Sequence, residues 1–178
     1  MTGNMEQTKV RLRAMEPEDL VLLYEVENDP KMWSVGDSCT PYSKYVLKQY
    51  IAQNTNDVFT DGQLRLMIEE KETSKTVGII DLIQFSCRHS RAEVGILIFQ
   101  DERGKGYAQE ALGLLCNYAI RFLSMHQLYA YISINNAASI NLFQKFDFQQ
   151  VGKLKDWLRS NDTYEDVIIL QKILQKNL

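Results

Sequence analysis

A short glycine-containing segment, Gln100–Ala108, carries the residues of this sequence that are best suited to bind an anion. It lies between a run of apolar residues and a stretch with helical periodicity. Glycines allow backbone N–H groups to close around an anion, and the N-terminus of a helix adds a favourable dipole. Arg103 and Lys105 add positive charge. The segment predicts a phosphate-binding turn at a helix start, with an ordinary capped turn as the alternative.

Two common phosphate motifs do not account for this segment. The pattern GxxxxGK[ST] is absent, and Gln109 stands where a dinucleotide fingerprint requires a small residue. The phosphate compound therefore has to be inferred from the neighbouring elements.

The hydrophobic patterns around the segment predict the elements that position it. Strands are expected at 9–15, 64–69, 76–85, 92–99, 128–134, 148–158 and 164–174, and helices at 17–27, 41–53, 107–122 and 139–146. Thr40 is the expected cap of the second helix, and Pro41 its first residue. This order predicts a single α+β domain with a mixed sheet over residues 1–178, in which residues 1–8 form a flexible N-terminus.

The composition is that of an ordinary globular protein, with 178 residues of which 45% are hydrophobic. Twenty Lys and Arg against 23 Asp and Glu give a net charge of −3, so no positive field is present to hold nucleic acid or a membrane surface. No apolar run approaches the ~20 residues of a membrane span, and the first ten residues contain no secretion signal. We expect a cytoplasmic protein without nucleic-acid or membrane partners.

The three cysteines, Cys39, Cys87 and Cys116, include no CxxC pair, which argues against a zinc site and a disulfide framework. Cys116 falls on the apolar face of the 107–122 pattern, where core packing is expected in preference to a nucleophile. No metal is expected.

Three motifs in order resemble the GNAT N-acetyltransferase superfamily. Arg103, Gly106 and Ala108 match its acyl-CoA signature Q/R-x-x-G-x-G/A, and the segments 92–96 and 136–148 resemble the strand before that signature and the block after it. The resemblance covers about Val10 to Leu174. Within the superfamily it is greatest to bacterial spermidine/spermine N-acetyltransferases, followed by ribosomal-protein N-terminal acetyltransferases. It implies a GNAT-like mixed central sheet flanked by helices.

The resemblance also implies acetyl-CoA as cosubstrate and a set of residues that bind it. Main-chain groups of Ile96, Leu97 and Ile98 would pair with the pantetheine arm, and Asn136 would hydrogen-bond it. Phe143 would close the thioester pocket, and Lys145 would lie near the far side of the cofactor. The pyrophosphate would be held by the turn residues Arg103, Gly104, Lys105, Gly106, Tyr107, Ala108 and Gln109.

The mechanism implied by the resemblance is direct attack of an amine on the acetyl thioester. A primary amine with a pKa near ~10.4 is mostly protonated at neutral pH, so a carboxylate is needed to take its proton. Glu93 is the candidate base, with an exposed strand-edge glutamate as the alternative. Backbone N–H groups of the 94–98 strand could stabilise the developing oxyanion.

The sequence departs from the family pattern at three positions. Phe143 stands where many relatives have a Tyr thought to protonate the leaving thiolate. Asp147 replaces the usual Gly before Phe148. Gln84 stands where the spermidine enzymes tend to carry an acidic residue that helps to bind polyamines.

We therefore expect an acetyl-CoA-dependent N-acetyltransferase that acts on a polyamine or another small primary amine. A peptide N-terminus is the rival acceptor. A catalytically silent acyl-CoA-binding sensor and a partner-binding domain are the alternatives outside catalysis. Assembly into a homo-oligomer is left open.

Overall fold

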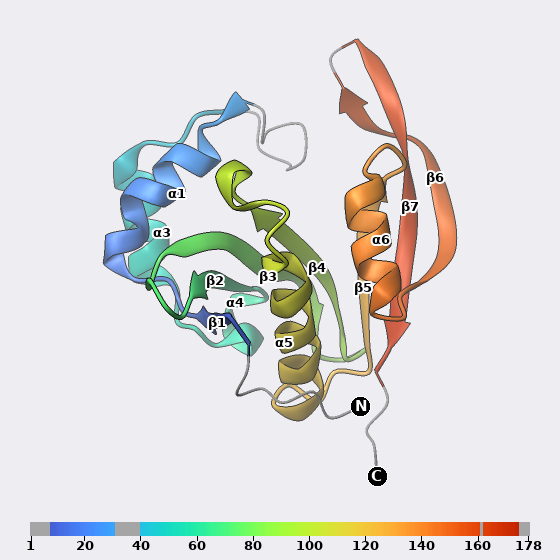
Figure 1. Ribbon diagram of the computed structural model, residues 1–178, viewed down its shortest axis with the longest axis horizontal. Helices are drawn as coiled ribbons and strands as arrows, with labels where there is room; N and C mark the ends of the chain where they lie inside the picture. The colour runs from blue at the N-terminus through green and yellow to red at the C-terminus, as the bar shows by residue number, and fades with distance from the viewer. Residues whose placement is uncertain (1–7, 31–39, 161, 175–178) are drawn as a thin grey trace.

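The computed structural model describes residues 8–30, 40–160 and 162–174 (Figure 1). Within these residues one seven-stranded sheet has the order β1-β2-β3-β4-β5-β7-β6. The strands are β1 (Val10–Arg13), β2 (Leu64–Glu70), β3 (Thr76–Ser86), β4 (Arg91–Ile98), β5 (Gln127–Ser133), β6 (Gln149–Ser160) and β7 (Thr163–Ile173). Neighbouring strands are antiparallel, except for the parallel pair β4 and β5. The predicted mixed sheet of an α+β fold is confirmed.

Helices cover both faces of this sheet (Figure 1). On one face, α5 (Tyr107–Arg121) and α6 (Ala137–Lys145) pack on the larger apolar core. On the other face, α1 (Leu20–Glu27) and α3 (Lys44–Gln53) pack on a smaller one. The remaining turns are η2 (Pro17–Asp19), α4 (Val58–Asp61) and η3 (Gln100–Glu102). The sequence patterns missed α4, because four residues are too few to display a helical period.

The start of α3 differs from the prediction made at Thr40 and Pro41. The helix begins three residues later, at Lys44, because the hydroxyl of Ser43 accepts a hydrogen bond from Val46 N at 3.2 Å and caps it. Pro17, in contrast, opens η2 as expected.

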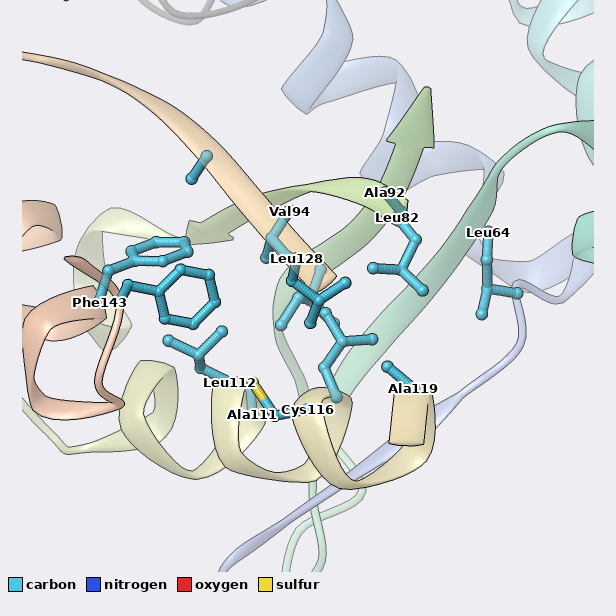
Figure 2. Close-up of a cluster of buried hydrophobic side chains, with 14 of the residues drawn as sticks. Leu64, Leu82, Ala92, Val94, Ala111, Leu112, Cys116, Ala119, Leu128 and Phe143 are labelled. Atoms are coloured by element: carbon cyan, nitrogen blue, oxygen red, sulfur yellow. The ribbon is translucent and has the colours of Figure 1, made fainter. Parts of the chain in front are cut away.

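Alternation along β4 determines which side chains face which helices. Ala92 and Val94 are buried in the larger core, where they meet α5 residues such as Leu112 and Cys116 (Figure 2). Glu93 and Gly95 therefore face the side of α1 and α3. Burial raises the pKa of the Cys116 thiol to about 11, which agrees with a packing role.

Of the predicted flexible segment 1–8, residues 1–7 lie outside the described residues, as does Cys39. Thr8 is held in place, because its hydroxyl accepts a hydrogen bond from Lys71 Nζ at 2.9 Å. Cys87 and Cys116 are free thiols. Within the described ranges, no helix is long and apolar enough to cross a membrane, and His, Cys, Asp and Glu form no group of three that could hold a metal ion.

Helix α6 ends in a Schellman motif with Asp147 at its left-handed position. Phe148 N donates to Phe143 O at 3.2 Å, and Asp147 N donates to Gln144 O at 3.1 Å. The rings of Phe143 and Phe148 meet edge to face at 4.9 Å, which supplies the usual hydrophobic contact. Asp147 has φ 62°, so a residue less suited than glycine occupies the left-handed position of this turn.

Replacing Asp147 by glycine is expected to stabilise the protein by about 0.5–1 kcal/mol. The left-handed conformation costs a non-glycine residue about 1–2 kcal/mol, which glycine avoids. Part of this stabilisation is lost, because glycine has more conformational freedom in the unfolded chain. The Asp147–Lys172 pair lost in the variant is 3.7 Å long and its carboxylate is 90% exposed, so it contributes little. Urea denaturation measures the difference, and a destabilised variant would contradict this account of the turn.

Candidate functional site

The parallel strands β4 and β5 stay together for only a short distance. Their register pairs are Arg91–Gln127, Ala92–Leu128 and Glu93–Tyr129, whereas β4 continues to Ile98. Beyond Glu93, β4 keeps its pairing with β3 but has no register partner on β5 among the described residues. The segment 94–98 therefore has one open edge in the middle of the sheet.

The hydrogen-bond pattern shows which main-chain groups line that open edge. Phe99 N donates to Val77 O at 3.0 Å, so Phe99 points its main-chain groups toward β3. In an antiparallel pair these directions alternate, so Leu97 also faces β3, while Ile96 and Ile98 face the opening. Of the three residues predicted to pair with pantetheine, Ile96 and Ile98 are thus oriented for it and Leu97 is not.

The glycine turn after β4 lies beside the open edge, because Arg103 Nε donates to Ile98 O at 3.1 Å. Gly104 and Gly106 have φ 79° and 89°, and no atom lies within 4 Å of where a Cβ on either would sit. Glycine is therefore needed at these two positions for its backbone conformation and not for lack of space, since left-handed φ angles favour glycine. Gly106 O accepts from Gln109 N and Glu110 N, which leaves the first amides of α5 directed at the turn.

The two cationic side chains of the turn, Arg103 and Lys105, differ in what holds them. Lys105 bonds to the buried Glu102 at 2.8 Å, and Lys75 bonds to the same carboxylate at 2.5 Å. The hydrogen bond from Lys105 is the main cause that lowers the pKa of Glu102. Lys105 is thus partly neutralised, and Arg103 supplies the main positive charge beside the first amides of α5.

The Tyr107 side chain points away from the turn, so only the main chain of Tyr107 is open to a ligand there. Its ring is buried, and its hydroxyl donates a hydrogen bond to Glu70, which raises the pKa of Tyr107 to about 12. The turn residues 103–109 thus surround the start of α5, and their binding of a pyrophosphate stays a prediction.

Residues of α6 lie at different depths. Asn136 is the N-cap of this helix, because its Oδ1 accepts from Ser139 N at 3.1 Å, and its amide nitrogen remains a potential donor. Lys145 is exposed in the last turn, nine residues or about 13 Å along the helix from Asn136. Asn136 and Lys145 thus lie at opposite ends of α6, and contact of either residue with the cofactor stays a prediction.

Removing the Asn136 amide is expected to weaken acetyl-CoA binding about fivefold, the value of one neutral hydrogen bond of about 1 kcal/mol. Asn136→Ser keeps a capping oxygen, whereas Asn136→Ala loses the cap and about 1 kcal/mol of stability. Calorimetry and thermal unfolding of the two variants separate the roles. Full affinity in both would leave Asn136 as a cap alone.

Phe143 is a core residue in this structure. Its side chain is 2% exposed and points from α6 toward the cluster that contains Val94, Leu112 and Leu128 (Figure 2). Val94, which begins the open segment of β4, belongs to the same cluster as Phe143. Contact between the Phe143 ring and the thioester stays a prediction.

Glu93 belongs to the last register pair of β4 and β5, and its side chain lies on the sheet face covered by α1 and α3. Its register partner on β5 is Tyr129, and on β3 it is Ile83. Burial is the main cause that raises the pKa of Tyr129, and the charge of Glu93 adds to it. The neutral Tyr129 hydroxyl and the Glu93 carboxylate thus lie close to the point where the open edge begins.

A charged cluster that the sequence patterns missed lies on the same face. Arg65 binds Asp81 through two hydrogen bonds of 3.0 Å and Glu27 through one of 2.6 Å, so it links β2, β3 and α1. Burial raises the pKa of Asp81 despite the guanidinium. Arg65 alternates with apolar residues, as a charged residue on an exposed strand face also does. The sequence pattern therefore cannot show that a helix covers Arg65.

An open pocket of about 620 Å³ is lined by neighbours of Glu93 on the side away from the glycine turn, although Glu93 itself is not part of the lining. Its lining includes Ile83 and Tyr129, the two register partners of Glu93, together with Gln84 and Arg91. Gln84 has φ 51° and lies in a β-bulge between Ile83 and Ser86. No local sequence pattern indicates this pocket, because a bulge depends on the pairing of two strands.

Comparison with known proteins shows the family of the chain. The sequence profile described as "Acetyltransferase (GNAT) domain" matches residues 9–149. The chain is 24% identical to spermidine N(1)-acetyltransferase of Vibrio cholerae over 160 residues, 90% of each protein. It is 29% identical to the uncharacterized N-acetyltransferase p20 of Bacillus licheniformis, over 89% of each.

A solved structure has the same fold. The crystal structure of spermidine N-acetyltransferase from Vibrio cholerae, in complex with CoA and spermine, superposes with a TM-score of 0.82 and 24% identity. The match covers 93% of this chain and 96% of that one.

Proposed function

The chain belongs to the acetyltransferase (GNAT) domain family, and from that premise we propose that it transfers the acetyl group of acetyl-CoA directly to a small primary amine. The observation that carries the proposal is the open edge of β4 next to the glycine turn. An extended pantetheine arm can pair with an open strand edge, and a pyrophosphate can bind the amides at the start of a helix.

The residues present fit acetyl-CoA as a substrate. Ile96 and Ile98 would bind the pantetheine arm, Asn136 would donate to it, and the turn 103–109 would hold the pyrophosphate with Arg103 as its main cation. The left-handed angles of Gly104 and Gly106 keep side chains out of this turn. Acetyl-CoA supplies the reactive thioester.

The chain's own groups would then serve the amine. Glu93, directly or through a water molecule, takes the proton of the ammonium so that the free amine can attack the thioester carbonyl. The candidate donor for the developing oxyanion is a main-chain N–H of the 94–98 segment that points at the opening, and Ile96 is the first such residue beyond the ladder with β5. The C–N bond forms, the C–S bond breaks, and the thiolate leaves with a proton from solvent.

The acceptor is proposed only as a class. The name of the Vibrio cholerae relative suggests a polyamine, and a peptide N-terminus remains the rival. A catalytically silent acyl-CoA-binding module is the second candidate function, because Phe143 cannot donate a proton to the leaving thiolate.

The proposal is tested by release of free thiol from acetyl-CoA in the presence of polyamines, amino acids and short peptides. An amine-dependent rate well above acetyl-CoA hydrolysis supports a transferase. Tight acetyl-CoA binding without turnover of any amine favours the silent module, and absence of binding overturns both.

Phe143→Tyr is expected to change kcat by no more than a few-fold. The ring is buried, so a hydroxyl without a partner costs about 1–3 kcal/mol, and a CoA thiolate leaves readily without a general acid. Steady-state kinetics and thermal unfolding measure both effects. A gain of a hundredfold, within the range of about 10²–10⁴ for general-acid help, would instead describe the native chain as a weakened catalyst.

A further inference from the structure

The pocket lined by Ile83 and Tyr129, the register partners of Glu93, is formed by a bulge in β3 and the turn after α4. The register of β3 against β4 shifts between Ile83 and Ser86, so Gln84 and Phe85 leave the ladder. Phe85 is held outside it, because its N–H donates to Gly62 O at 3.2 Å and its ring meets Phe59 edge to face at 5.3 Å. A volume of about 620 Å³ lies within the range of small-molecule sites.

Two charged residues line this pocket, and they differ in what already holds them. The carboxylate of Asp61 accepts hydrogen bonds from both the N–H and the hydroxyl of Thr55, at 3.0 and 2.9 Å. Arg91 is exposed, and it takes part in none of the ion pairs of the described residues. The Arg91 guanidinium is therefore the charge most open to a ligand.

Arg91 lines the pocket, and Glu93 lies between two of its lining residues, Ile83 and Tyr129. Arg91 and Glu93 are two residues apart on β4, so their side chains leave the same face of the sheet with Cα atoms about 6.6 Å apart. Tyr129 is the register partner of Glu93 and lines the pocket together with Arg91. The other polar side chains of the lining, Gln63, Gln84 and Ser86, are neutral.

We propose that Arg91 binds the carboxylate of an amino acid whose primary amine lies at Glu93, so that the acceptor class is carboxylate-bearing amines. This inference rests on the proposed acetyl transfer. A guanidinium matches a carboxylate with two parallel hydrogen bonds, whereas it repels a second ammonium group. The carboxylate stays unchanged in the reaction: the amine loses a proton to Glu93, gains the acetyl group, and CoA leaves as the thiol.

The test compares matched amines with and without the carboxylate. Thiol release is measured with amino acids, their carboxamides and their decarboxylated amines, for example lysine, lysinamide and 1,5-diaminopentane. The wild-type kcat/KM is expected to be at least tenfold higher for the carboxylate member of the preferred set. Arg91→Gln should remove this preference by raising KM, while kcat and acetyl-CoA affinity persist.

Arg88→Gln is the matched control, because Arg88 lies in the turn between β3 and β4 and does not line the pocket. It should leave the preference intact, and thermal unfolding confirms that both variants fold. The inference would be overturned if diamines or polyamines were acetylated as well as amino acids, and if Asp61→Asn, instead of Arg91→Gln, lowered turnover. The proposed transfer would remain in place.

Calorimetry with the CoA-loaded protein gives a readout that does not depend on turnover. Amino-acid binding that Arg91→Gln weakens, without turnover of any amine, supports the pocket and counts against the transfer reaction. Absence of binding by every amino acid in the panel, together with absence of turnover, overturns the inference.

Discussion

Replacing Glu93 by glutamine lowers amine turnover about a hundredfold or more at neutral pH, while acetyl-CoA affinity stays unchanged. The variant keeps the shape of the side chain and removes its ability to take a proton, and general-base help is worth about 10²–10⁴-fold. The position supports the separation of effects, because Glu93 faces the side of α1 and α3, whereas the glycine turn follows the far end of β4.

Raising the pH should rescue much of this loss. An amine with a pKa near ~10.4 gains about tenfold in its free-base fraction for each unit of pH below that value, so the need for a base declines. The rate of Glu93→Gln should therefore rise more steeply with pH than that of the native protein.

Glu72→Gln controls for the change in net charge, because Glu72 is exposed in the turn between β2 and β3. It should leave turnover intact. Native turnover in Glu93→Gln, or an equal loss in acetyl-CoA affinity, would assign Glu93 a structural role.

Replacing Gly106 by valine weakens acetyl-CoA binding at least tenfold, or about 1.4 kcal/mol. Gly106 has φ 89°, an angle that strains a β-branched residue whether or not its side chain finds room. The backbone must then shift, and the amides at the start of α5 shift with it. Calorimetric titration of acetyl-CoA measures the effect at a temperature where the variant is folded.

Gly62→Val separates strain from binding. Gly62 has φ 67° at the end of α4, and no atom lies within 4 Å of where a Cβ on it would sit, so the backbone penalty is similar. Both variants should unfold at lower temperature, but only Gly106→Val should lose acetyl-CoA affinity. Equal affinity in Gly106→Val and the native protein would refute the assignment of the pyrophosphate site.

The sequence predicts most of the sheet because its strands alternate clearly. Ala92 and Val94 face one side and Glu93 the other, as their pattern requires, and the switch to a helical period at Tyr107 locates the glycine turn. The start of α3 was misplaced because Pro41 and Ser43 both carry helix-start signals, and only Ser43 forms the cap.

Other features of the site depend on pairing between distant residues. Leu97 differs from Ile96 and Ile98 only through the register of β4 on β3, which no local pattern contains. Lys105 is partly neutralised because Glu102, shared with the distant Lys75, lies beside it. The pocket near Arg91 requires a bulge that appears only when β3 pairs with β4.

Direct transfer from acetyl-CoA to an amine is tested most directly by single-turnover mass spectrometry. Protein in excess is mixed with acetyl-CoA and the best amine of the thiol-release panel, and the reaction is stopped at intervals. We expect N-acetylated amine and free CoA to form together, with the mass of the protein unchanged throughout. A protein species that carries an acetyl group before the product appears, or release of CoA without acetylated amine, would contradict the account.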